Sequence, residues 1–91
     1  MLWDLQNRQA RRAAFLPQLR AMARDHYLLG RGRVGPMELM DAGFEAFDRA
    51  LDDFDPQRDY DLHAYVDIVV RGAMFQLVLD SHGQRKQIRA A

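Results

Sequence analysis

The chain of 91 residues contains no cysteine, a single serine and few long apolar runs. Without cysteine it can form neither a disulfide framework nor a thiolate metal site, and this composition suits a reducing cytosol. The longest apolar stretch, residues 68–79, is interrupted by Arg71, Gly72 and Gln76 and is too short to cross a bilayer. The first residues include Asp4 and lack the apolar core of a secretory signal. We therefore expect a soluble, cytoplasmic protein without a membrane partner.

The net charge is zero, with 13 basic and 13 acidic residues, but the two signs are segregated along the chain. Seven arginines and two acids lie in residues 1–33, ten acids and two arginines in 34–67, and four basic residues and one acid in 68–91. Such blocks create local fields of opposite sign on one small domain. One interpretation is a solvated surface whose basic ends pair with the acidic middle. The other is an acidic face for a basic protein partner, with basic flanks near nucleic acid.

Helical spacing of the apolar residues, with no alternation typical of a strand, predicts an all-α fold. Pro17 and Pro36 each suit the first turn of a helix, and Asp55-Pro56 is expected to stop one. Residues 30–35, with three glycines, are expected to form a loop. Asp61 is a candidate cap for the last helix, with Gly83 as its end. We predict a small bundle of about four helices, covering residues 4–15, 17–29, 36–54 and 61–82. The chain then divides into an N-terminal helix (1–16), a helical domain (17–83) and a basic tail (84–91).

Candidate core residues follow from the same spacing. On the second predicted helix, four residues are expected to point inward: Leu19, Met22, Ala23 and Tyr27. On the third, intervals of 4, 3, 4 and 3 define one apolar face: Met40, Phe44, Phe47, Leu51 and Phe54. The centre of the fourth helix is apolar on more than one face, which indicates either a central position in the bundle or a surface for a partner.

Three patterns resemble functional motifs but lack the residues or the predicted neighbouring elements that those motifs require. Residues 30–35, GRGRVG, match a dinucleotide-binding fingerprint by letter but follow a predicted helix rather than a strand. An EF-hand loop opening at Asp53 would place Arg58 and Ala64 where calcium binding needs glycine and glutamate. The three histidines are far apart in the sequence, and Ser81 has no nucleophile context. We expect no enzymatic activity, no metal and no cofactor.

The segment ELMDAGFEAFDRALDDFDPQRD, residues 38–59, resembles the second conserved region of bacterial sigma factors. Family members carry runs such as DLVQVGLIGLIRAIDRFDPERG at the same spacing, and the likeness extends over residues 19–80. It implies a sigma-like helical fold in which the third helix binds the coiled coil of the RNA polymerase β′ subunit. The residues that this resemblance implies for polymerase binding are Glu38, Asp41, Phe44, Glu45 and Asp48. Ala42, Phe44 and Asp48 depart from the residues usual in the family, so the contacts are expected to differ.

In sigma factors the fourth helix reads the promoter −10 element, using a tyrosine and an adjacent tryptophan pair. Tyr65 matches the tyrosine, whereas Ile68 and Val69 replace the tryptophans and offer no stacking surface. The residues implied for any contact with DNA are Tyr65, Arg71, Arg85, Lys86 and Arg89. The residues expected to form an apolar surface for a protein partner are Ile68, Val69, Met74 and Phe75.

These observations predict a sigma-like transcription protein that binds core RNA polymerase, with DNA contact accessory and a companion DNA-binding protein as a further partner. Two alternatives stay open at the level of sequence. One is a true −10-reading sigma module of altered specificity. The other is a decoy that occupies the polymerase without initiating transcription.

Overall fold

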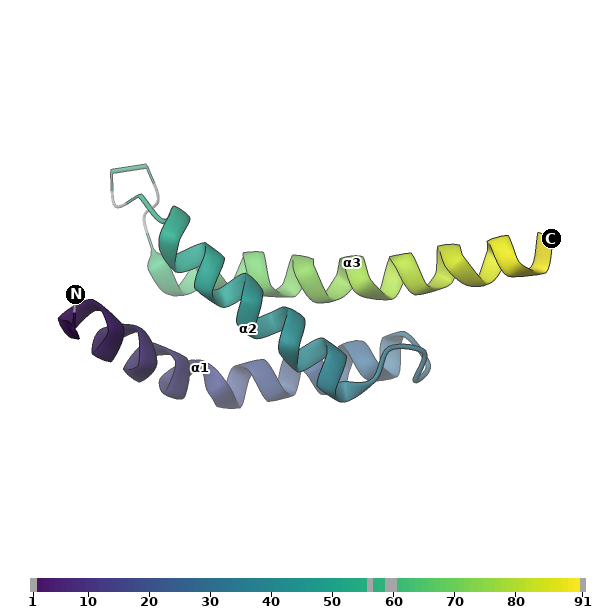
Figure 1. The fold of residues 1–91 in the computed structure, drawn as a ribbon, viewed down its shortest axis with the longest axis horizontal. Coiled ribbons are helices and arrows are strands. Elements are labelled where there is room, and N and C mark those ends of the chain that lie inside the picture. The colour runs from purple at the N-terminus through teal and green to yellow at the C-terminus, as the bar shows by residue number, and fades with distance from the viewer. Residues whose placement is uncertain (1, 56, 59–60, 91) are drawn as a thin grey trace.

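The computed structural model describes residues 2–55, 57–58 and 61–90, with side chains described for 7–55, 57–58 and 61–82. Within these residues there are three helices and no strand: α1 (Leu2–Leu29), α2 (Pro36–Asp53) and α3 (Leu62–Ala90). Figure 1 shows α2 running antiparallel to both α1 and α3, and the C-terminal part of α3 extending beyond the other two helices. The all-α prediction is confirmed for the described residues.

The prediction of about four helices is wrong, because residues 4–15 and 17–29 form one helix. Pro17 lies inside α1, which bends near its middle (Figure 1). Proline removes a backbone hydrogen bond and crowds the preceding turn, so it kinks a helix without having to end it. Phe15 and Leu19, on either side of Pro17, are both buried in the same core. Their packing explains why the helix continues through the kink.

The end of α1 confirms the loop predicted for residues 30–35. The amide of Gly32 donates to the carbonyl of Tyr27 (3.0 Å), and that of Arg31 to Leu28 (3.0 Å), which is the hydrogen-bond pattern of a Schellman motif. This turn needs positive backbone φ angles, and φ is 54° at Arg31 and 76° at Gly32. The turn therefore reverses the chain between α1 and α2.

Local signals also explain the ends of α2 and the start of α3. Pro36 occupies the first turn of α2, and the helix stops at Asp53, just before Asp55-Pro56. The Asp61 carboxylate accepts hydrogen bonds from the amides of His63 (2.9 Å) and Ala64 (3.5 Å). The predicted N-terminal cap is thus confirmed.

The predicted end of α3 at Gly83 is wrong, since the helix continues to Ala90. Glycine lowers helix stability by about 1 kcal/mol but does not forbid helical geometry. The proposed boundary between residues 83 and 84 therefore falls inside α3.

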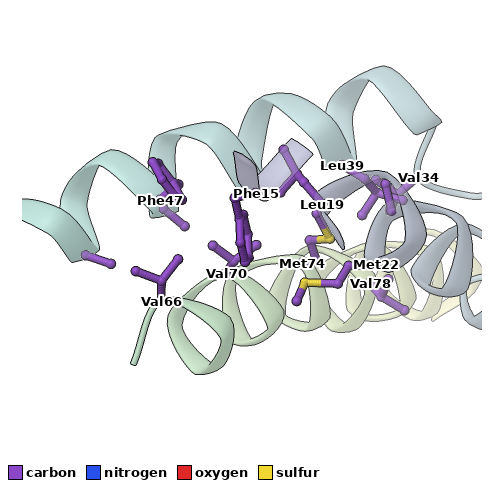
Figure 2. Close-up of a cluster of buried hydrophobic side chains, with 13 residues drawn as sticks. Phe15, Leu19, Met22, Val34, Leu39, Phe47, Val66, Val70, Met74 and Val78 are labelled. Atoms are coloured by element: carbon purple, nitrogen blue, oxygen red, sulfur yellow. The ribbon is translucent and has the colours of Figure 1, made fainter. Parts of the chain in front are cut away.

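The core lies between the three helices (Figure 2). Its buried apolar residues are Phe15, Leu19, Met22, Ala23, Val34, Leu39, Ala46, Phe47, Ala50, Val66, Val70, Met74 and Val78. Phe15 and Phe47 stack with ring centroids 5.3 Å apart and join α1 to α2.

Two predicted core assignments need correction. Tyr27 is exposed, and His26 is buried in its place, with Nδ1 donating to the Met22 carbonyl at 2.8 Å. On α2 the buried face is rotated from the predicted apolar stripe. It consists of Leu39, Gly43, Ala46, Phe47 and Ala50. Phe47 is the one residue that belongs to both the predicted and the observed face. The other residues of the predicted apolar face are half-buried.

Side chains from both other helices pack directly against Gly43. A Cβ atom added there would lie 2.5 Å from Leu19 Cδ1 and 2.7 Å from Met74 Cε. Both side chains are fully buried and come from α1 and α3 respectively. A side chain at position 43 would therefore displace residues of both neighbouring helices.

We expect Gly43→Ala to destabilise the fold and Gly72→Ala to stabilise it. Overpacking costs about 1–3 kcal/mol and alanine gains about 1 kcal/mol over glycine in a helix, so Gly43→Ala should lower the free energy of unfolding by up to about 2 kcal/mol. Gly72 is the matched control, because a Cβ there meets nothing within 4 Å. Chemical denaturation at low protein concentration measures both. Equal effects of the two substitutions would contradict the close packing at Gly43.

Candidate protein-docking surfaces

Three acidic side chains form a stripe along the outer face of α2. Glu38, Asp41 and Glu45 are exposed, and their spacing of three and four residues places them on one face over about 10 Å of helix. Among the described residues, none of the three makes an ion pair. We call these three residues the acidic stripe.

The three acids of the acidic stripe, taken together, do not stabilise the folded state. Like charges three or four residues apart on a helix destabilise it by a few tenths of a kcal/mol per pair. Glu38 alone has a local benefit, because it lies in the first turn of α2, where the helix dipole favours an acid. The repulsion is relieved when a positively charged partner covers the stripe. Its geometry therefore suits a basic protein surface.

The other two residues predicted to bind polymerase, Phe44 and Asp48, are engaged by α1. The Arg12 guanidinium carbon lies 4.7 Å from the centroid of the Phe44 ring, a cation–π distance. Arg12 also approaches the Asp48 carboxylate at 3.4 Å, and Arg8 approaches it at 3.9 Å. The structure thus separates the predicted set into an exposed acidic stripe and a pair already in contact with arginines.

Arg8 connects the basic start of the chain to the end of α2. Its guanidinium donates to the Asp48 carbonyl at 3.1 Å and to the Asp52 carboxylate at 2.5 Å. A cation near the C-terminal end of a helix also favours the helix dipole. The first interpretation of the charge blocks, in which the ends pair with the middle, therefore describes this half of α2. The second interpretation still fits the acidic stripe.

A second surface lies on the outer face of α3. Ile68 is 70% exposed, Phe75 47% and Leu79 46%, whereas Val70 and Met74 on the opposite face are fully buried. With Gly72, the three exposed residues have spacings of 4, 3 and 4 and form one apolar stripe along the helix. We call Ile68, Gly72, Phe75 and Leu79 the apolar stripe.

This surface corrects the predicted partner-binding set. Ile68 and Phe75 are exposed as predicted, and Val69 is half-buried. The prediction that Met74 belongs to the exposed apolar surface is wrong, because its side chain is fully buried beside Gly43 and Leu19. Leu79 was missed, although its position eleven residues after Ile68 places it on the same helical face.

Gly72 forms a recess within the apolar stripe. An open depression of about 380 Å³ is lined by His26, Ile68, Arg71, Gly72 and Phe75. Its lining comes from both α1 and α3, and a Cβ added at Gly72 would meet nothing within 4 Å. The depression is open to solvent and lies on the apolar stripe.

Of the five residues predicted to contact DNA, the structure describes the side chains of Tyr65 and Arg71, and each is engaged by a neighbouring residue. Tyr65 is half-buried and packs against Phe54, with ring centroids 5.9 Å apart. Arg71 donates to the Asp67 carboxylate at 3.2 Å. This hydrogen bond and the Asp67 charge raise the pKa of Arg71, and Asp25 on α1 adds to the effect. The remaining three, Arg85, Lys86 and Arg89, have side chains outside the described part of the structure.

Residues Leu62–His82 of α3 are long and apolar enough to cross a membrane, judged by length and composition alone. The core helix of a soluble protein passes the same test. Here Val66, Val70, Met74 and Val78 pack into the three-helix core, which explains part of this apolar character. The exposed apolar stripe is the part that the core does not explain.

Comparison of the chain with protein-family models, with curated proteins and with solved structures gives no match.

We expect neutralisation of an acid to change the free energy of unfolding differently in the two halves of α2. Asp48→Asn removes an attraction to Arg8 and Arg12 and should lower the free energy of unfolding by up to about 1 kcal/mol at low salt. Asp41→Asn removes repulsion from Glu38 and Glu45 and should leave stability unchanged or raise it by a few tenths of a kcal/mol. Denaturation at low and high salt tests this, because salt should shrink both effects. A larger loss from Asp41→Asn than from Asp48→Asn would contradict the assignment.

Proposed function

We propose that the chain is a sigma-like transcription protein that binds core bacterial RNA polymerase through the acidic stripe of α2. The observation that carries this proposal is the exposure of Glu38, Asp41 and Glu45 on one face, without an ion pair in the described part of the chain. In the resemblance to sigma factors, the same helix face binds the coiled coil of the β′ subunit. A complementary basic helix would speed and orient association with such a face.

The polymerase contact proposed here is narrower than the sequence alone implies. Phe44 and Asp48 are held by Arg12 and Arg8, so we assign them to the α1–α2 contact. Glu38, Asp41 and Glu45 remain as the proposed contact residues. The partner is a basic surface, and the binding is expected to weaken as salt increases.

Reading of the −10 element is not part of the proposed function. At the positions of the family's tryptophan pair, Ile68 and Val69 offer no stacking face, and the side chains at Gly72 and Phe75 cannot hydrogen-bond a base. Tyr65 is half-buried against Phe54. We therefore propose that promoter recognition belongs to a companion protein and that this chain contributes polymerase binding.

We expect charge reversal in the acidic stripe to abolish polymerase binding without unfolding the chain. Asp41→Lys and Glu45→Lys should each reduce the retention of core polymerase on the immobilised protein by about 10-fold or more, because like charges would face each other. Circular dichroism checks the fold of each variant. Asp80→Lys is the matched control, since Asp80 is an exposed acid on α3. Unchanged retention by both α2 variants, or equal loss with Asp80→Lys, would contradict the proposal.

A further inference from the structure

The large and small residues of the apolar stripe are placed so that two copies of α3 can pack against each other. Phe75 is a large exposed side chain, and Gly72, one turn earlier, lines the open depression and has nothing within 4 Å of the place of a Cβ. Two copies of α3 placed antiparallel, with a two-fold axis between these positions, bring each Phe75 over the Gly72 of the other copy. The same axis brings Ile68 of each copy opposite Leu79 of the other. All four apolar positions are then used in both copies, as a two-fold interface requires.

We propose that a second copy of this chain covers the apolar stripe, forming an antiparallel α3–α3 dimer. The spacing of 4, 3 and 4 is that of helices packing knobs into holes. The glycine allows close approach and accepts the phenylalanine, so that each large side chain meets a small one. Ile68 and Leu79 bury each other at the two ends of the contact.

Charge supports the antiparallel direction. The start of α3 carries Asp61 as its cap and Asp67, whereas the last turns of the helix carry Arg85, Lys86 and Arg89 against no acid. An antiparallel pair places the basic end of each α3 near the acidic beginning of the other, and this register puts Asp61 opposite Lys86. A parallel pair would place basic end beside basic end. Complementary ends favour the first arrangement.

The geometry of the fold leaves room for this contact. The stripe lies opposite the buried face of α3, which carries Val70 and Met74, and α3 extends past the other helices (Figure 1). The overlap from Asp61 to Lys86 gives a helix pair about 39 Å long. With four apolar positions per copy the interface is narrow, so we expect a dissociation constant in the micromolar range. The inference goes beyond the proposed function and does not rest on it, because the acidic stripe belongs to α2.

Sedimentation equilibrium over low to high micromolar concentrations tests the dimer. Ile68→Glu should weaken it by about 100-fold, because an unpaired carboxylate would be buried against Leu79 of the second copy. Leu28→Glu is the matched control. Leu28 is 66% exposed on α1, close to the 70% of Ile68, and its substitution should leave the dissociation constant within about twofold. A chain that stays monomeric, or a dimer that Ile68→Glu leaves intact, would overturn the proposal.

Disulfide crosslinking tests the direction of the helices, since the chain has no cysteine of its own. A mixture of Ile68→Cys and Leu79→Cys chains should form a mixed disulfide-linked pair, and neither chain alone should crosslink efficiently. Crosslinking of Ile68→Cys to itself would show a parallel pair and overturn the antiparallel proposal. A monomer that instead partitions onto phosphatidylcholine vesicles would assign the stripe to a lipid surface and also overturn it. Retention of polymerase by the Ile68→Glu variant reports separately on the acidic stripe.

Discussion

The packing of side chains from α1 and α3 against Gly43 is the constraint on which the arrangement of this small fold depends. Leu19 from α1 and Met74 from α3 fill the space that a side chain at position 43 would need. The three helices therefore meet at one glycine, and the small residues Ala46 and Ala50 continue this close packing along α2. Because α2 is held on this face, its opposite face, with the acidic stripe, is directed to solvent.

The same arrangement decides which charged residues are available to a partner. The antiparallel path of α1 beside α2 brings Arg8 and Arg12 to Asp48 and Asp52, so the acidic block is neutralised at one end. Towards the start of α2, Glu38, Asp41 and Glu45 remain exposed without an ion pair among the described residues. On α3, burial of Val70 and Met74 turns Ile68, Gly72, Phe75 and Leu79 outward. Two surfaces of different chemistry thus lie on different helices.

Local chemistry made part of this fold predictable from the sequence. The turn at residues 31 and 32, the proline at the start of α2 and the Asp61 cap depend on one or two residues each, and the structure confirms all three. Helix number was not predictable in the same way, because Pro17 is a local break signal that the packing of Phe15 and Leu19 overrides. The buried face of α2 was misplaced for a related reason. Close helix packing buries small residues such as Gly43 and Ala46, which carry little hydrophobic signal of their own.

We propose that the acidic stripe binds the β′ coiled coil of RNA polymerase. The most direct test of this binding is a photo-activated crosslinking amino acid at position 45, irradiated in the presence of core polymerase, with the same amino acid at position 80 as control. We predict a crosslink from position 45 to the β′ coiled coil and none from position 80. A crosslink to another part of the polymerase, or none from position 45 in a folded protein, would contradict the account.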